Sequence, residues 1–231
     1  MSAFSLPYLL NMQAEVIGPV VPVDLNASTV CRLDFTEQNP YLKTTDLADT
    51  IRFEILVKQL LQEQNATVGI GGYLENRVIY SRSPHFNAAE APRSVHLGVD
   101  IWTPAFTPVL SPFPGKVHSF QNNNHFGDYG PTIILEHQLA EFTFYTLYGH
   151  LTVSSLALLK VGQEIKKGEA FTQLGPYPEN GDWPPHLHLQ LITDLMGMAG
   201  DFPGVCTMQD REKFANICLD PNLLLKCKYL D

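Results

Sequence analysis

Residues 186–190 read His-Leu-His-Leu-Gln, within the apolar run PHLHLQLI of residues 185–192. This alternation is typical of a β-strand. Because side chains alternate between the two faces of a strand, His186 and His188 are expected to lie a few ångströms apart on one face, where they can share a metal ion. A pair of this kind also arises by chance or as two solvent-facing histidines. The prediction of a metal site therefore depends on partner residues elsewhere in the chain.

Two further clusters supply such partners. A His-Leu-Gly-Val-Asp segment begins at His96 and ends at Asp100, and Gly98 is expected to let the backbone turn so that both side chains converge. A Tyr-Gly-His-Leu segment places His150 at the end of another predicted strand. A hydrolytic zinc site usually takes three protein ligands and leaves the fourth position for water, which one Asp and two His satisfy. Two more histidines then remain for proton transfer and for stabilising an oxyanion.

The sequence around these clusters predicts a mainly β fold, a compact antiparallel sheet domain. From about residue 94, short apolar runs are separated by Pro, Gly and Asn, which is typical of strands joined by turns. The predicted strands are 109–110, 116–120, 132–137, 142–148 and 187–192. A second helix is expected around residues 209–217, and the absence of a 20–50-residue repeat excludes a solenoid.

The N-terminal part predicts an α+β extension. One helix is expected from Asp46, with Thr45 or Asp46 as its N-cap and Asn65 after its end. Its apolar positions are Leu47, Ile51, Ile55, Leu60 and Leu61. Two strands, 67–70 and 77–80, are expected to follow through a Gly-Gly pair. The predicted division is an extension at 1–85 whose helix packs on the core, the β domain at 86–200 and a C-terminal tail at 201–231.

Composition limits the partners and the compartment. The 231 residues are 45% hydrophobic and 17% charged, which is typical of a globular protein, and the formal net charge of −9 argues against nucleic acid or an anionic membrane as a partner. The four cysteines form no CxxC pair, so we expect reduced thiols. The N-terminal residues lack the pattern of a signal peptide and no apolar window is long enough to span a membrane, so we expect a cytoplasmic protein. The sequence does not indicate an oligomeric state.

At the residues above, the chain resembles the M23 peptidases, the LytM or lysostaphin-type zinc endopeptidases. Their signature is HxxxD, then a histidine in a Tyr-x-His-Leu turn, then HxH, and the resemblance covers roughly Pro92 to Asp194. It implies a barrel-sandwich hybrid-like fold and an enzyme in which zinc-activated water hydrolyses a peptidoglycan-like or glycine-rich peptide. It further implies the site residues, with zinc as the sole cofactor. They are His96, Asp100 and His188 as zinc ligands, with His150 and His186 acting on the attacking water and the tetrahedral intermediate.

Two features separate this chain from the cell-wall enzymes of that family. Residues 180–185 read Asn-Gly-Asp-Trp-Pro-Pro where the family commonly has a loop containing Gly and Ser, and no export signal is seen. The chain also resembles an M23-like module that lies between a phosphotransferase and a class III aminotransferase, through residues 128–131 and 201–206. The alternative function is therefore an intracellular hydrolase of another small amide, or a binding or regulatory protein without peptidase activity.

The remaining histidines are interpreted as structural. His85, His118 and His125 have no ligand-type residue at a suitable spacing and are expected on the surface or in loops. His137 is expected to have a structural role or to support a ligand from outside. Arg93 has two equal interpretations, contact with a substrate carboxylate or a pair with Glu90.

Three other protein classes fit less well. A cupin-type oxygenase needs an acidic residue soon after HxH and a later histidine, but position 192 is Ile and no histidine follows His188. Residues 111–117 and 161–169 resemble the half-motifs of biotinyl and lipoyl carriers, but the segment between them has histidines in place of the modified lysine. A non-catalytic M23 relative usually loses ligands, whereas this chain keeps all five positions.

Overall fold

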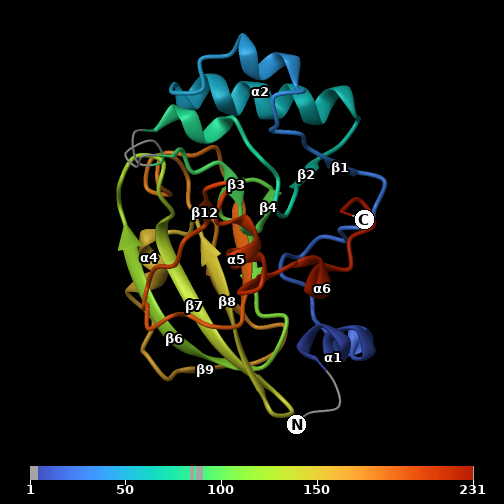
Figure 1. Cartoon of the computed structure of the whole chain (residues 1–231), viewed down its shortest axis with the longest axis vertical. Helices are drawn as coiled ribbons and strands as arrows, with labels where there is room; N and C mark the ends of the chain where they lie inside the picture. Colours follow the sequence, from blue (N-terminus) through green and yellow to red (C-terminus); the bar gives the residue numbers. More distant parts are fainter. Residues whose placement is uncertain (1–4, 84–85, 87–90, 231) are drawn as a thin grey trace.

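A nine-stranded mixed sheet forms the centre of the fold in this computed structural model, which describes residues 5–83, 86 and 91–230 (Figure 1). Its strands are β1 (Val30–Arg32), β2 (Val68–Gly71), β4 (Val99–Trp102), β6 (Gly115–Asn123), β7 (Gly130–Leu139), β8 (Phe142–Gly149), β9 (Glu164–Ile165), β11 (Leu187–Ile192) and β13 (Cys218–Leu219). The spatial order is β1-β2-β4-β11-β8-β7-β6-β9, and β13 pairs with β11. Only β1 and β2 pair in parallel. This confirms the mainly β prediction, and within the described residues the sheet is open and forms no closed barrel.

Smaller elements surround this sheet. Two-stranded sheets join β5 (Pro108–Leu110) to β10 (Ala170–Gln173) and β3 (Val95–His96) to β12 (Val205–Cys206). The α-helices are α1 (Leu6–Met12), α2 (Thr50–Glu63), α4 (Val153–Leu156), α5 (Arg211–Ala215) and α6 (Asn222–Leu225). Short 3₁₀-helices are Ala14–Val16, Pro40–Lys43 and Ile79–Arg82. In Figure 1, α2 lies at one end of the molecule and α1 with α6 toward the other.

The core lies on both faces of the central strands. Ile133, Leu135 and Leu189 belong to one buried cluster, while Ile134 and Leu147 belong to another on the opposite face. Burying each such side chain contributes about 1.5–3 kcal/mol relative to exposure. Strand β11 lies between β4 and β8 and is buried along its whole length. Polar side chains on β11 must therefore find partners inside the protein.

The predicted strands of the β domain are confirmed, but residues 77–80 do not form a strand. The chain there turns into the 3₁₀-helix Ile79–Arg82, with Ser81 N–H donating to Val78 O and Ser83 N–H to Tyr80 O. Alternating apolar residues suggested a strand. The cause of the difference is Arg77, whose side chain is directed into the core and held there by carboxylates.

Helix α2 begins later than predicted, and among its predicted apolar positions Leu60 is buried whereas Ile51 and Ile55 are not. Asp49 is the N-cap and its carboxylate accepts from the N–H groups of Ile51 and Arg52, so the helix begins at Thr50 and not at Asp46. Ile51 and Ile55 are 60% and 59% exposed. The buried side chains are those of Thr50, Phe53, Leu56, Val57 and Leu60. Apolar residues occur at helical spacing on two neighbouring faces of this helix, and the spacing alone did not indicate which face is buried.

Segments outside the β domain extend its sheets. Strands β1 and β2 come from the N-terminal 85 residues, and β2 pairs with β4, with Gly71 opposite Asp100. Strands β12 and β13 follow residue 200 and pair with β3 and β11. The domain boundaries stay a prediction, but backbone pairing crosses both of the proposed positions.

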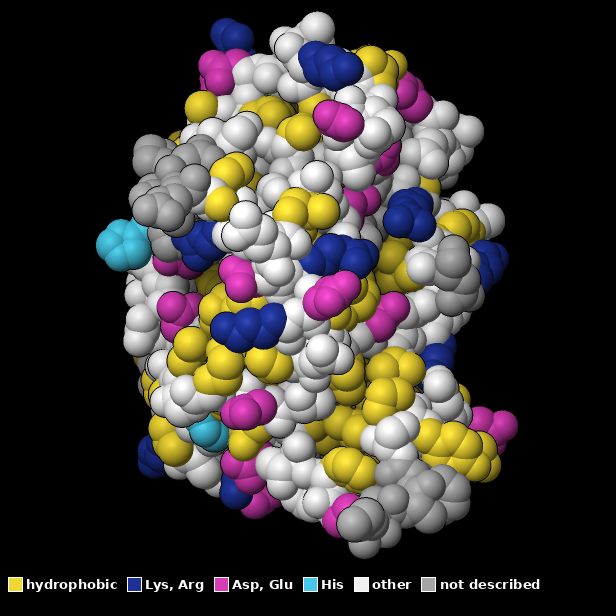
Figure 2. Space-filling model, viewed as in Figure 1, with side chains coloured by type: hydrophobic (Ala, Val, Ile, Leu, Met, Phe, Trp, Pro, Cys, Tyr) yellow, Lys and Arg dark blue, Asp and Glu magenta, His cyan; other side chains and the backbone are white. Residues whose placement is uncertain are grey.

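The surface and the cysteines complete the description. Basic and acidic side chains are intermingled on the face shown in Figure 2. In the described part of the chain, none of the helices has the length and apolar character needed to cross a membrane. All four cysteines are buried free thiols, and burial raises the pKa of the Cys218 thiol to about 12.

Candidate metal centre

Three potential metal ligands meet where β3, β4 and β11 come together. His96 ends β3, and Asp100 on β4 is the direct antiparallel partner of His188 on β11. His96 Nε2 lies 2.9 Å from His188 Nδ1 and 3.2 Å from Asp100 Oδ1, and His188 Nδ1 lies 3.1 Å from the same oxygen. All three residues are buried. The structure therefore brings together the predicted ligand set.

His96 and His188 each use one ring nitrogen for a hydrogen bond that points away from Asp100, and the other ring nitrogen faces the carboxylate. His96 Nδ1 lies 3.0 Å from the Gly72 carbonyl oxygen, and His188 Nε2 lies 3.1 Å from Gln190 Oε1. Neither oxygen carries a proton, so the ring N–H of each histidine points outward and its other nitrogen presents a lone pair inward. The amide of Gln190 is itself oriented, because its Nε2 donates to the Pro203 carbonyl.

This arrangement fits a zinc ion. Two imidazole nitrogens and one carboxylate oxygen converge, and this donor set is one that zinc binds. Ligands at the usual Zn–N and Zn–O distances around a tetrahedron are separated by about 3.4 Å, close to the 2.9–3.2 Å observed. His96, Asp100 and His188 would hold the ion and leave one coordination position open.

Electrostatics keeps His96 and Asp100 in the protonation states that bind metal. Burial lowers the pKa of His96 to about 3, so its imidazole is neutral at pH 7. Burial alone would raise the pKa of the Asp100 carboxyl, but its neighbours His96 and Arg77 lower that pKa well below its usual range. The site is therefore a neutral imidazole beside a carboxylate.

Gly98 serves this site through close packing. A Cβ atom at this position would lie 2.5 Å from the Leu189 carbonyl oxygen and 2.9 Å from the His188 ring. The chain also bends at Gly98, between β3 and β4, as predicted, so the close packing adds a second role. Only a glycine lets β11 approach closely enough to place His188 beside His96.

The two other predicted site histidines lie next to the ligands. His150 Nδ1 lies 2.8 Å from the Asn180 carbonyl oxygen and His186 Nδ1 lies 2.7 Å from the Pro184 carbonyl oxygen. Both rings thus donate through Nδ1 and keep the Nε2 lone pair as an acceptor. His186 Nε2 is 3.9 Å from Asp100 Oδ1. Burial lowers the pKa of His186 to about 4 and holds that of His150 well below its usual value, so both are neutral bases at pH 7.

Aromatic rings fix the orientation of these two histidines. The Trp102 indole stacks on His186 with centroids 4.1 Å apart and an interplanar angle of 16°. The centroids of the His150 and His186 rings are 4.2 Å apart. The segment 180–185, which distinguishes this sequence, supplies both carbonyl acceptors and also Trp183, whose ring lies against both histidines.

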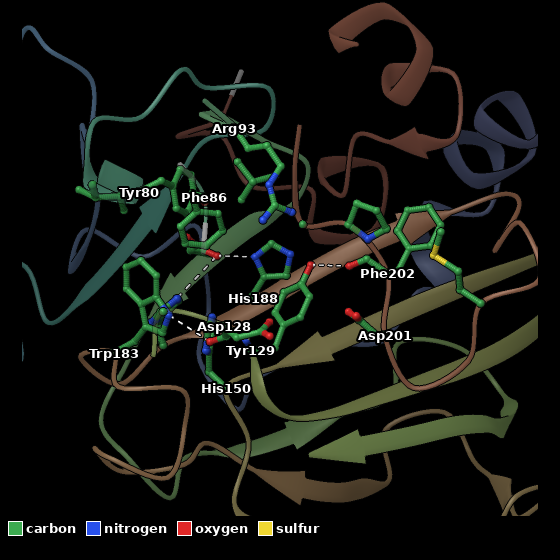
Figure 3. Close-up of a pocket in the computed structure, with 18 residues that line it drawn as sticks. Tyr80, Phe86, Arg93, Asp128, Tyr129, His150, Trp183, His188, Asp201 and Phe202 are labelled. Carbon is green, nitrogen blue, oxygen red and sulfur yellow. Dashed lines mark hydrogen bonds and ion pairs between the residues drawn. The ribbon is translucent and has the colours of Figure 1, made fainter. Parts of the chain in front are cut away.

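A pocket of about 280 Å³ opens onto this cluster. Figure 3 shows Arg93 on one side of His188, with Asp128 and His150 on another and Asp201 further along. Among the described residues that line the pocket, Arg93 is the only lysine or arginine. Its guanidinium lies over the Phe86 ring, 5.4 Å from the centroid.

His137 and His118, which were interpreted as structural, bond to residues outside the ligand set. His137 Nδ1 bonds to the Pro114 carbonyl and its Nε2 to Thr146 Oγ1, at 3.0 and 2.7 Å. His118 contacts the Ser119 hydroxyl. His85 and Glu90 lie outside the described residues, so the predicted Arg93–Glu90 pair stays a prediction.

Comparison with known proteins bears directly on this site. Residues 94–198 match the family model described as Peptidase family M23. The match covers slightly less than half of the chain, and residues 94–198 are called the M23 domain below. The M23 domain contains all three potential ligands and both neighbouring histidines.

Three solved structures are similar to parts of this chain. A zinc-containing peptidase from Vibrio cholerae is 28% identical over 42% of this chain and 27% of that chain, with a TM-score of 0.33. The lysostaphin catalytic domain from Staphylococcus simulans is 24% identical over 58% and 80%, with a TM-score of 0.39. A putative M23 peptidase from Pseudomonas aeruginosa is 20% identical over 60% and 48%, with a TM-score of 0.38. The chain thus spans about a quarter of the Vibrio protein. A search of the curated proteins found no match.

Several residues that shape the site were not assigned a role from the sequence. The acceptors on Gly72 and Gln190 and the hydroxyl of Tyr129, which donates to Gln190 Oε1 at 2.8 Å, are known only from the fold. Arg77, which contacts Asp100, lies outside the M23 domain. Of these residues, only Arg77 could have been predicted to contact a buried carboxylate, because an arginine within an apolar run implies an anionic partner in the core.

Proposed function

We propose that this chain is a zinc-dependent endopeptidase of the M23 type that hydrolyses the amide bond of a peptide. The observation that carries the proposal is the convergence of two imidazole lone pairs and one carboxylate oxygen beside two neutral histidines. A structural zinc site is closed by four protein ligands, whereas three ligands leave a position for water. Zinc, when bound, would activate that water and polarise the scissile carbonyl.

His186 and His150 divide the proton transfer in this proposal. Each holds its Nδ1 proton on a backbone carbonyl, so each can accept a proton at Nε2 and then carry a positive charge. His186 Nε2 is directed toward Asp100, so we assign it to the attacking water. The proton that it accepts then passes to the leaving amine. His150 acts on the tetrahedral intermediate by accepting its hydroxyl proton at Nε2 as the carbon–nitrogen bond breaks, so that the acid product leaves as a carboxylate. Groups of this kind contribute about 10²–10⁴ in rate.

The size of the pocket supports a second candidate, a short peptide or another small amide as the substrate. At about 280 Å³, the pocket is at the lower end for ligand sites. Its walls include Tyr80 and Phe86 from before the M23 domain and Phe202 from after it. The resemblance of residues 201–206 to a module joined to phosphotransferase and aminotransferase domains supports the same candidate.

A panel of amide substrates tests both candidates in one experiment. It contains glycine-rich peptides, D-amino-acid peptides, dipeptides and small amides, each incubated with zinc-loaded protein, metal-free protein and His150→Ala. We expect cleavage by the zinc-loaded protein alone, with His118→Ala as the control that keeps full activity. Cleavage that survives metal removal would contradict the proposal. Cleavage restricted to long peptides would exclude the small-amide candidate.

A further inference from the structure

Asp100 uses its two carboxylate oxygens for different partners. Oδ1 faces the nitrogens of His96 and His188, whereas Oδ2 accepts from Nη1 of Arg77. Arg77 is fully buried, and its Nε donates to Glu75 Oε2 at 2.7 Å. The guanidinium is therefore clamped between two carboxylates, which gives it a fixed place beside the ligand set.

The surroundings of Arg77 are built to hold it there. The guanidinium carbon lies 5.5 Å from the Phe35 ring centroid, and Nη1 is 3.5 Å from the Tyr80 hydroxyl. Gly71 leaves the necessary space, since a Cβ atom there would lie 2.7 Å from Arg77 Nη2. Burying three charged groups together costs desolvation energy, and replacing a well-placed buried ion pair by apolar residues is often neutral or stabilising. Stability alone therefore does not explain this cluster.

The chemical consequence concerns how Asp100 binds a metal. A carboxylate can give a cation one oxygen or both, and a second oxygen would add to the three protein ligands and the water of a hydrolytic site, which raises its coordination number from four to five. With Oδ2 held by Arg77, only Oδ1 is directed at the metal position. The coordination number of the metal therefore depends on a residue that the M23 domain does not contain.

We infer that Arg77 is a positioning residue that keeps Asp100 a one-oxygen ligand and so keeps the metal site four-coordinate, with three protein ligands and one water. The inference rests on the metal centre of the proposed function. The N-terminal segment then contributes twice to that centre, through the Gly72 carbonyl on His96 and through Arg77 on Asp100. The N-terminal segment therefore positions two of the metal ligands in addition to packing on the core.

The test replaces zinc by Co²⁺, whose visible absorption is several-fold stronger in four-coordinate than in five-coordinate sites. Metal-free full-length protein is loaded with Co²⁺, and the spectra of the wild type, Arg77→Met and Arg82→Met are compared. Arg82 is the matched control, because it is also a buried arginine of this segment but bonds to Thr50 and not to Asp100. We expect four-coordinate spectra for the wild type and Arg82→Met, and a several-fold weaker, five-coordinate spectrum for Arg77→Met.

A second variant covers the case in which Arg77→Met does not fold. Gly71→Ala keeps the arginine but displaces its guanidinium, and it should shift the spectrum in the same direction. A four-coordinate spectrum for each folded Arg77→Met or Gly71→Ala variant would overturn the inference, as would a five-coordinate wild type. If the wild type binds no Co²⁺ or Zn²⁺, the proposed metal centre itself fails, and that result differs from the others.

Discussion

Replacing His186 or His188 by alanine separates a metal ligand from a proton-transfer group on one strand. Both residues are 3% exposed, His188 on β11 and His186 directly before it. Each packs against three rings. His186 contacts Trp102, His150 and Trp183, and His188 contacts His96, Tyr129 and His150. The two substitutions therefore remove comparable packing, and a difference between the variants in the effect of zinc on the melting temperature reports on metal binding.

The magnitude follows from the linkage between binding and folding. At free zinc 100 times its dissociation constant, binding stabilises the native state by about 2.7 kcal/mol. For a chain of this size, 1 kcal/mol changes the melting temperature by about 2–4 °C, so zinc should raise it by about 5–11 °C. We expect this increment in the wild type and His186→Ala and not in His188→Ala.

The assay is a set of melting curves with zinc and with a chelator, together with metal analysis of each variant. Comparing the zinc increment within each variant removes the cost of the cavity that either substitution creates. His150→Ala is expected to behave like His186→Ala. If His186→Ala loses zinc as completely as His188→Ala, the assignment of roles is wrong and the site is a closed structural one.

Four other predictions follow from particular contacts. Gln190→Leu removes the acceptor for His188 Nε2–H and should weaken zinc binding about 10–100-fold in a competition titration with a chelator. Gln190→Glu keeps an acceptor and should bind zinc more tightly than Gln190→Leu in that titration. Burial lowers the pKa of His137 to about 4, so the unfolded chain takes up this proton first as the pH falls. His137 alone should lower the stability of the metal-free protein by up to about 3 kcal/mol between about pH 6.5 and 4, in addition to the contributions of the buried site histidines. The stability measured by urea titration should therefore depend less steeply on pH in His137→Gln than in the wild type. Arg93→Gln should raise KM for substrates with a free carboxylate and leave KM unchanged for their amidated forms; an equal change for both would remove Arg93 from substrate binding. The proposed cytoplasmic location predicts four titratable thiols in freshly denatured protein, and fewer would contradict it.

Sequence patterns predicted the part of the site that depends on strand geometry. The period of two placed His186 and His188 on one face, and β4 with β11 then brought Asp100 opposite His188. These are short-range consequences of alternation and of strand pairing. The longer strands β6, β7, β8 and β11 were predicted for the same reason.

The remainder depends on contacts that a sequence pattern does not encode. Strands of two or three residues, such as β12 and β13, are too short to show a period. The carbonyl of Gly72 is a backbone group that any residue would supply. Arg77 was assigned to a strand because its neighbours are apolar, although its charge is neutralised by Asp100, 23 positions away.

X-ray absorption by the zinc-loaded protein tests the central claim most directly, because it reports the atoms bound to the metal. The structure predicts one zinc per chain, coordinated by two imidazole nitrogens, one carboxylate oxygen and one water oxygen. A centre with three or more imidazoles, a sulfur ligand or no stoichiometric zinc would contradict the account.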